Sequence, residues 1–143
     1  MKYLIDTNVV SELIKKQPNP HVVRWVDTQD SLQLYLSVIT IGEIRKGVEK
    51  LTDAARQERI YTWLTSHLLI RFDGRILPIE TDTMLIWGAL TGRLEKEGLT
   101  LAAVDSFIAA IALQHQLIIA TRNTSDFQGT GLQLINPWEI DPA

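Results

Sequence analysis

Short apolar runs alternate along the chain with longer stretches in which apolar residues recur every three or four positions. The short runs indicate strands, and the wider spacing indicates helices with one buried face. The expected strands cover residues 3–5, 32–38, 75–79, 117–121 and 132–136. The expected helices cover residues 9–16, 20–28, 40–51, 54–69, 81–97 and 102–115. Because strands and helices alternate, the pattern favours an α/β fold with a largely parallel sheet.

The predicted helix 102–115 is apolar on nearly every face, which is typical of a deeply buried helix. Asp105 interrupts this pattern. The residues that surround it at helical spacing are all apolar, namely Leu101, Ile108, Ala109 and Ala112. A carboxylate in such surroundings is costly unless a cation or a hydrogen-bond donor meets it. Asp105 is therefore the acid with the strongest functional indication.

Four acids from distant parts of the chain converge on one edge of the predicted sheet. Asp6 follows the first strand, and Glu43 lies in the first turn of the helix after the second strand. Asp126 follows the fourth strand, and Asp105 starts the helix before that strand. A crossover helix runs antiparallel to its strands, so its N-terminus lies at their carboxyl ends, where such sheets bind ligands. The four carboxylates are therefore expected to share one site.

Each acid also has a structural alternative. Glu43 follows Thr40 by three residues, and "TIGE" fits a helix capping box. Asp126 fits an Asx-turn or a cap, and Asp6 fits the cap of the first helix. For Asp105 the alternative is its position near a helix N-terminus, a contribution of about 0.3–1 kcal/mol that does not explain its apolar surroundings. A shared role explains all four together.

Composition narrows the chemistry. The chain of 143 residues fits one domain, 1–143, and contains no cysteine and only three histidines, at His21, His67 and His115. A bound metal would therefore be a hard cation with oxygen ligands, such as one or two Mg²⁺ or Mn²⁺ ions. A cation relieves the repulsion of crowded carboxylates, activates water and stabilises a phosphate in transfer. Phosphodiester hydrolysis is the reaction that suits such a site.

Neighbouring polar and basic residues have two interpretations. Thr7, Asn8 and Ser11 fit either hydrogen bonds to the acids or the capping of the first helix. Arg45 and Lys46 fit either contact with a phosphate or a solvated helix face. The net charge of −3 argues mildly against a nucleic-acid binder that works by bulk charge. With no long apolar run and no signal-peptide pattern, a cytoplasmic protein is expected.

Five blocks of this sequence, in order, resemble the PIN-domain ribonucleases, specifically VapC-type toxins of the FitB-like branch. The blocks are "YLIDTNVVSEL", "LSVITIGEIRKGVEKL", "DSFIAAIAL", "LIIATRNTSDF" and "LINPWE". The resemblance implies a three-layer α/β/α fold around a mainly parallel sheet of about five strands. It further implies an endoribonuclease that uses Mg²⁺ or Mn²⁺, held by Asp6, Glu43, Asp105 and Asp126. Thr7 and Asn123 match polar positions beside this set, and Arg122 is a candidate RNA contact.

The resemblance also implies partners: RNA, a second copy of the chain in a homodimer, and a VapB/FitA-type antitoxin. Operator DNA would be bound only through the antitoxin, and no membrane is involved. Apolar residues of the first two helices are candidates for the antitoxin surface, with Trp25 the most notable among them. Many relatives have a proline shortly before the third acid, where this chain has "LAAV" at 101–104. The fourth acid is the least dependable ligand of the family, so Asp126 can act through water.

Two other classes of function remain as alternatives. A haloacid-dehalogenase-like phosphatase also begins with an apolar strand and an aspartate, but its second acid is replaced here by Asn8. A fold relative without catalysis, or a binding module whose acids are structural, is the second alternative. Retention of the complete acidic set favours the ribonuclease.

Overall fold

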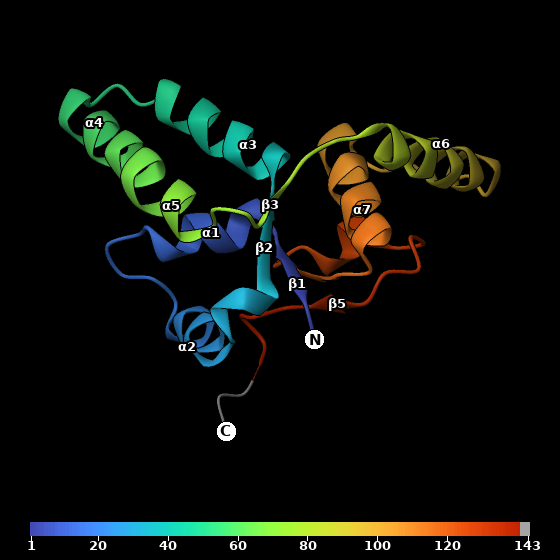
Figure 1. Ribbon diagram of the computed structural model, residues 1–143, viewed down its shortest axis with the longest axis horizontal. Helices are drawn as coiled ribbons and strands as arrows, with labels where there is room; N and C mark the ends of the chain where they lie inside the picture. Colours follow the sequence, from blue (N-terminus) through green and yellow to red (C-terminus); the bar gives the residue numbers. More distant parts are fainter. Residues whose placement is uncertain (141–143) are drawn as a thin grey trace.

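Five short strands form a parallel sheet in the order β3-β2-β1-β4-β5 in the computed structural model, which describes residues 1–140 (Figure 1). The strands are β1 (Tyr3–Ile5), β2 (Leu34–Ser37), β3 (Ile76–Leu77), β4 (Ile118–Ala120) and β5 (Leu134–Ile135). All four neighbouring pairs are parallel, with Tyr3 opposite both Leu34 and Ile118. All carboxyl ends therefore lie at one edge, as expected from the alternation of elements.

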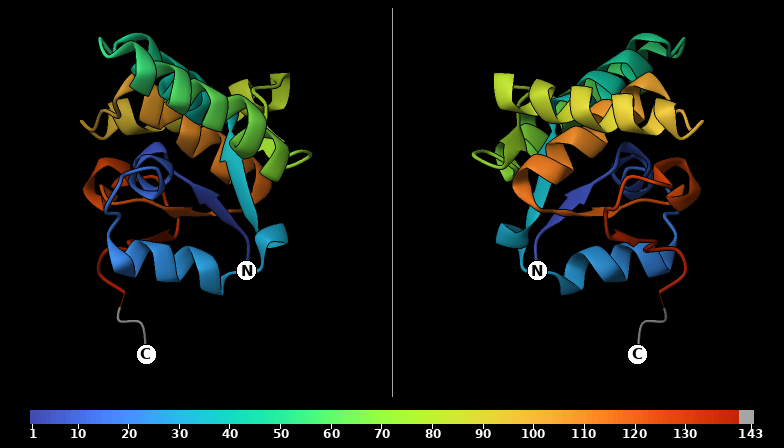
Figure 2. Two further views of the ribbon diagram at one scale, coloured as in Figure 1. Left: turned by 90° about the vertical axis from the view of Figure 1, so that its left-hand side faces the viewer. Right: turned by 90° about the vertical axis from the view of Figure 1, so that its right-hand side faces the viewer.

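Helices cover both faces of this sheet and make three layers (Figures 1 and 2). The helices are α1 (Thr7–Leu13), α2 (Pro20–Thr28), α3 (Val38–Glu49), α4 (Ala54–Trp63), α5 (Leu69–Arg71), α6 (Thr81–Lys96) and α7 (Ala103–His115). Side chains of β1 alternate between the two faces. Tyr3 and Ile5 join the core beneath α1, α2 and α3, whereas Leu4 joins the core beneath α6 and α7.

Several boundaries differ from those expected. Helix α1 begins at Thr7 because the Asp6 side chain accepts a hydrogen bond from the Thr7 backbone N–H, which caps the helix. A 3₁₀-helix, Ser31–Gln33, precedes β2 and shortens it. The helix expected over residues 54–69 is interrupted by a π-helical turn, Leu64–Leu68. Propensity does not reveal such turns in advance, because every residue in them is compatible with an α-helix.

The start of α3 overturns the capping-box alternative for Glu43. The N-cap of α3 is Ser37, whose hydroxyl accepts a hydrogen bond from the Thr40 backbone N–H at 3.2 Å. Thr40 is therefore inside the helix, and Glu43 lies in the second turn rather than the first. A residue at that position is too far along the helix to cap it. Glu43 is thus not explained by the helix end.

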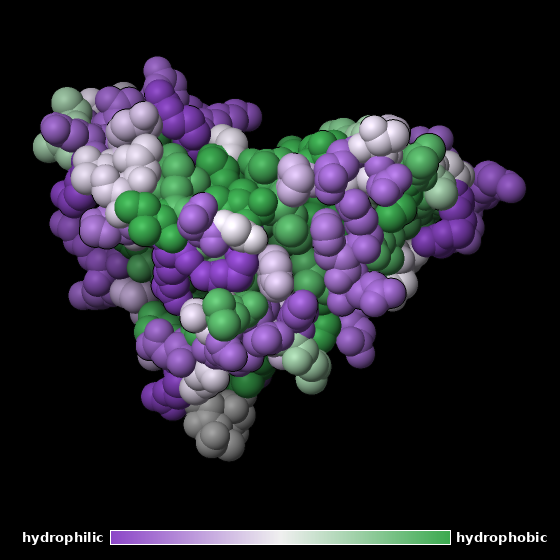
Figure 3. Space-filling view, in the orientation of Figure 1, coloured by the Kyte–Doolittle hydropathy of each residue, from purple (hydrophilic) through white to green (hydrophobic). Residues whose placement is uncertain are grey.

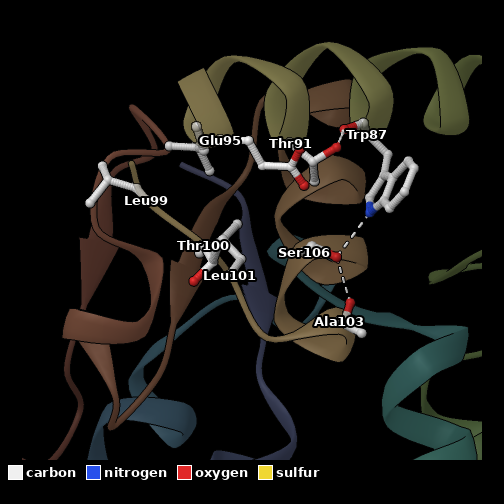
Figure 4. Close-up of a pocket in the computed structure, with 9 residues that line it drawn as sticks. Trp87, Thr91, Glu95, Leu99, Thr100, Leu101, Ala103 and Ser106 are labelled. Atoms are coloured by element: carbon white, nitrogen blue, oxygen red, sulfur yellow. Dashed lines mark hydrogen bonds between the residues drawn. The ribbon is translucent and has the colours of Figure 1, made fainter. Parts of the chain in front are cut away.

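Helix α7, which carries Asp105, is anchored at its N-terminus to α6. The Trp87 indole Nε1–H donates to the Ser106 hydroxyl at 2.9 Å, and that hydroxyl donates to the Ala103 carbonyl at 2.5 Å (Figure 4). The Trp87 ring also stacks on Phe107 with 5.4 Å between ring centroids. A cavity of about 220 Å³ lies beside these contacts, between α6 and the loop before α7. The first turn of α7 is thereby fixed although its N-cap, Ala102, has no side-chain hydrogen bond.

Trp25 does not lie on a partner surface. It is only 6% exposed and packs edge-on against Tyr3, with 5.0 Å between ring centroids. The expectation that Trp25 belongs to an antitoxin surface is therefore wrong, because its ring is part of the core beneath α2. Among the helices of residues 1–140, none is both long enough and apolar enough to cross a membrane.

Candidate active site

The four acids of the predicted site come from four separate elements at the carboxyl edge of the sheet. Asp6 joins β1 to α1 and is 6% exposed. Glu43, in α3, and Asp105, in the first turn of α7, are partly buried. Asp126 is exposed in a 3₁₀-helix, Thr124–Phe127, that follows β4. Their roles remain predictions, but the fold brings all four side chains to one edge.

Mutual repulsion links these carboxylates. Burial, followed by the negative charges of Asp6, Asp126 and Glu43, raises the pKa of Asp105 to about 6. Burial also raises the pKa of Asp6, to which Glu43 and Asp126 add a smaller contribution. Like charges near one another disfavour the ionised form of each group. The edge is therefore a concentrated patch of negative charge that a cation would stabilise.

Asp6 is held by hydrogen bonds on both carboxylate oxygens. Oδ1 accepts from the Thr7 backbone N–H at 2.8 Å, and Oδ2 accepts from the Thr121 hydroxyl at 2.8 Å. These two bonds lower the pKa of Asp6 and partly offset the effect of burial. Asp6 thus caps α1, as the structural alternative expected, while it also belongs to the acid cluster.

Thr121 has a fixed role that the sequence analysis did not identify. Its hydroxyl oxygen accepts from the Asn8 amide at 3.1 Å and from the Asn123 backbone N–H at 3.1 Å. Since a hydroxyl has one proton, these two incoming bonds leave that proton for Asp6. Thr121 is fully buried directly after β4, beside β1. The only available signal was a hydroxyl at the end of a buried strand, which is too common to single out.

Glu43 is held by a second hydroxyl network. The Thr7 hydroxyl lies 2.5 Å from Glu43 Oε1 and 3.0 Å from the Thr40 hydroxyl. The Thr40 hydroxyl lies in turn 3.4 Å from that of Ser37, the N-cap of α3. With its single proton, Thr7 donates to the carboxylate and accepts from Thr40. Thr7 therefore supports Glu43, and Thr40 is a second supporting residue that the sequence analysis assigned to capping.

The donor set suits a hard divalent cation, because every candidate ligand is an oxygen atom. Across residues 1–140, however, no three aspartate, glutamate or histidine side chains stand close enough to surround an ion together. Asp6 and Glu43 are held by hydroxyl donors, whereas Asp105 and Asp126 accept no hydrogen bond from the described chain. The residues therefore fit a metal by chemistry and charge.

The remaining predicted residues are placed differently from one another. Arg45 forms an ion pair with Glu49 at 2.9 Å and lies over the Tyr61 ring, which favours a structural role. Ser11 is exposed and lines a groove together with Glu43. Lys46 is exposed on α3, and Arg122 is exposed immediately after Thr121.

Glu12 is a buried acid that the sequence analysis overlooked. It is 6% exposed, and Oε1 forms an ion pair with Lys15 at 2.9 Å. Oε2 accepts from the Asn19 backbone N–H at 3.0 Å. The hydrogen bond from Lys15 is the largest factor that lowers the pKa of Glu12. Glu12 therefore fastens the loop between α1 and α2 and occupies Lys15, one of the basic residues.

Comparison with known proteins identifies one family. A family model described as "PIN domain" matches residues 3–131, a range that contains all four acids. The chain is 38% identical to "Toxin FitB" of Neisseria gonorrhoeae, over 94% of this chain and 97% of that protein. It is 38% identical to "VapC ribonuclease Y4jK" of Sinorhizobium fredii, over 95% and 97%. A solved structure of FitAB bound to an IR36 DNA fragment matches with a TM-score of 0.91, at 36% identity and 97% coverage of both chains.

Replacement of Asp105 tests the repulsion at the site. The folded protein binds a proton at Asp105 more tightly than the unfolded chain, because the pKa rises from 3.8 to about 6. Stability without divalent ions should therefore fall as pH rises from about 4 to 6. Asp105→Asn removes this loss, so at pH 7.5 its Tm should exceed that of the wild type by roughly 2–4 °C after solvent screening. At pH 4 the two should melt alike, and the exposed Asp73→Asn should show neither effect.

Replacement of Thr121 tests the hydroxyl that joins β4 to Asp6. Thr121→Val keeps the shape but leaves Asp6, Asn8 and the Asn123 N–H without their partner, which should cost about 1–3 kcal/mol in urea unfolding. Thr121→Ser keeps the hydroxyl, so its free energy of unfolding should fall clearly less than that of Thr121→Val. Equal stability of the valine variant and the wild type would contradict the proton assignment made above.

Proposed function

The chain belongs to the PIN domain family, and from that premise we propose that it is the toxin of a toxin–antitoxin pair, a metal-dependent endoribonuclease that acts in the cytoplasm. The observation that carries this proposal is the coupling of four carboxylates from four elements at one sheet edge. Relatives named as a toxin and as a VapC ribonuclease, each matched over nearly the full length, support it.

In the proposed reaction Asp6, Glu43 and Asp105 hold one or two Mg²⁺ or Mn²⁺ ions, and Asp126 joins them directly or through water. Mg²⁺ or Mn²⁺ held there would activate water for attack on a phosphodiester and offset the charge that develops on the phosphate. Hydroxyl donors fix two of the carboxylates before any ion binds, because Thr121 orients Asp6 and Thr7 orients Glu43. Preorganised ligands lose little freedom on binding, which favours both affinity and correct geometry.

Other polar residues complete the proposed site. Asn8 spans it, since its amide donates to Thr121 while its carbonyl accepts from the Arg122 backbone N–H at 3.2 Å. Asn123 begins the loop that carries Asp126. Lys46 and Arg122 are exposed and are the more suitable cations for RNA contact, whereas Arg45 is already paired with Glu49.

A groove that starts at the acids is the proposed binding place of the antitoxin. It has a volume of about 200 Å³ and lies between α1, α3 and α4. Its walls are mainly apolar, and Glu43 and Ser11 are among the residues that line it; the apolar lining includes Val10, Ile14, Ile44, Ile60 and Trp63. A segment that filled the groove would contact Glu43 and block the site. The FitAB structure, which is bound to DNA, supports a similar two-protein complex whose antitoxin contacts operator DNA.

The proposed homodimer is supported by apolar side chains around the same edge. Large exposed apolar residues occur at the starts of α3, α6 and α7 and in the loop before α6: Val38, Ile79, Met84, Leu85 and Val104. Figure 3 shows apolar surface across the notch between α3 and α6. Contiguous apolar surface of this kind is typical of an interface between proteins.

The decisive experiment is cleavage of cellular RNA by the purified chain with Mn²⁺ or with EDTA. Asp6→Asn should reduce cleavage at least a hundredfold, because it removes one charge from the proposed metal site. It should also weaken Mn²⁺ binding measured without RNA by calorimetry. Circular dichroism should report an unchanged fold, since the amide oxygen can still accept from the Thr7 backbone N–H and cap α1, although the hydrogen bond from Thr121 is lost.

The matched control is Asp82→Asn, an exposed acid in the first turn of α6. It should cleave RNA and bind Mn²⁺ as the wild type does. Full activity of Asp6→Asn, or cleavage that EDTA leaves unaffected, would refute the assigned site. A folded wild-type chain that binds no Mn²⁺ and cleaves no RNA would instead support the non-catalytic alternative.

Filling the groove tests the antitoxin proposal. Gly47 lines the groove in the last turn of α3, and a Cβ there would meet no atom within 4 Å. Gly47→Phe should leave the Tm unchanged or higher, because glycine costs about 1 kcal/mol in a helix. It should weaken binding of a co-expressed antitoxin at least tenfold, because the ring occupies the groove. Gly88→Phe, at an equally open helical position in α6, should bind normally.

A further inference from the structure

Arg122 has a backbone that is fixed relative to the acid cluster. It directly follows Thr121, whose hydroxyl donates to Asp6. Its N–H donates to the Asn8 side chain at 3.2 Å, and its carbonyl accepts from the Asn136 amide at 3.3 Å. The Cα of Arg122 therefore cannot move without disturbing residues that hold the candidate site. An arginine in this position is one side-chain length from the acids.

The side chain of Arg122 is held as well. Its guanidinium carbon lies 5.3 Å from the centroid of the Trp138 ring, a separation typical of a cation–π contact. Trp138 is itself fixed, because it packs against the core beneath α1 and α2 and its N–H donates to Asn136 at 2.9 Å. Because Arg122 is exposed, its guanidinium is accessible to solvent while it lies over the indole. We call this pair the Arg122 platform: a positively charged group over a ring that packs against the core.

The charge on this platform is not neutralised by a salt bridge within residues 1–140, and Glu12 attracts it at longer range. Two other arginines that lie over aromatic rings differ in this respect. Arg45, over Tyr61, is paired with Glu49 at 2.9 Å. Arg75, over Phe72, donates to the Leu34 carbonyl at 2.7 Å and to other backbone carbonyls. Arg122 therefore retains free donors as well as a free face, beside a site proposed to act on phosphodiesters.

We propose that Arg122, held over the Trp138 ring, is a nucleotide-binding subsite that stacks one unpaired base of the RNA beside the acid cluster. This inference rests on the proposed ribonuclease function. An unpaired base can stack on a guanidinium plane, and the edge of that plane can donate to the adjoining phosphate. A base inside a duplex is already stacked on both faces and cannot do this. The subsite therefore positions a single-stranded segment so that the next phosphate faces the carboxylates.

The test measures binding rather than cleavage. Every variant is made in the Asp6→Asn protein, which should not cleave RNA. The probes are a fluorescein-labelled unstructured 12-nucleotide RNA and a labelled hairpin duplex of equal charge. Binding of each probe is measured by fluorescence anisotropy. Arg122→Lys keeps the charge but loses the plane, so affinity for the single strand should fall roughly tenfold. Affinity for the duplex should not change. Arg122→Gln loses the charge as well. The slope of log affinity against log salt concentration should therefore decrease by about one, because one phosphate contact is lost.

The matched control is Arg71→Lys, an exposed arginine over the Phe72 ring at 5.6 Å that belongs to α5 rather than to this edge. It should bind both probes as the background protein does. The stacking subsite is refuted if Arg122→Lys binds the single strand as tightly as the Asp6→Asn background does. It is also refuted if the affinities for the single strand and for the duplex fall by the same factor. That result would leave the ribonuclease proposal intact, provided the wild type cleaves RNA with Mn²⁺. If the wild type does not cleave RNA and the Asp6→Asn background does not bind it, both the ribonuclease proposal and the stacking subsite are refuted.

Discussion

The carboxylate of Asp6 is the point at which capping, strand pairing and the acid cluster meet. One oxygen caps α1 through the Thr7 N–H, and the other accepts from Thr121 at the end of β4. The Asp6 N–H donates in turn to the Ala120 carbonyl at 2.9 Å, which continues the pairing of β1 with β4. Because the same residue ends a central strand and begins a helix, its side chain can point only along the carboxyl edge. The geometry of the edge follows from this constraint.

Without a cation, the burial and mutual repulsion of the carboxylates at this edge lower the stability of the folded protein. The pKa values of Asp6 and Asp105 are both raised by burial first and by neighbouring carboxylates second. The fold offsets part of this cost with hydroxyl donors at Thr7 and Thr121, which hold Glu43 and Asp6, whereas Asp105 and Asp126 accept no hydrogen bond from the described residues. Such a balance is typical of functional sites, where charge needed for a reaction is maintained at some expense in stability.

Helix α1 separates two surfaces that serve the proposed function differently. On one side, residues such as Val10 line the apolar groove with α3 and α4. On the other side, Asn8 contacts Thr121 and the Arg122 backbone, and Glu12 fastens the loop to α2. The groove is apolar and suits a protein segment, whereas the Arg122 platform is cationic and suits RNA. The proposed inhibitor and the proposed substrate can therefore reach the acids from different directions.

The family resemblance implied the three layers. The sequence pattern alone predicted a parallel sheet with helices and four acids at its carboxyl edge. These depend on the period of apolar residues and on the rule that parallel strands share a carboxyl edge, both of which are local or topological. It did not predict that Ser37 rather than Thr40 caps α3, or that Trp25 is core, because those outcomes depend on which helix faces which strand. Thr121 and the Arg122–Trp138 pair were not predicted as units for the same reason. Their partners are 14 to 115 residues away along the chain, and only tertiary packing brings such hydrogen-bond donors and rings together.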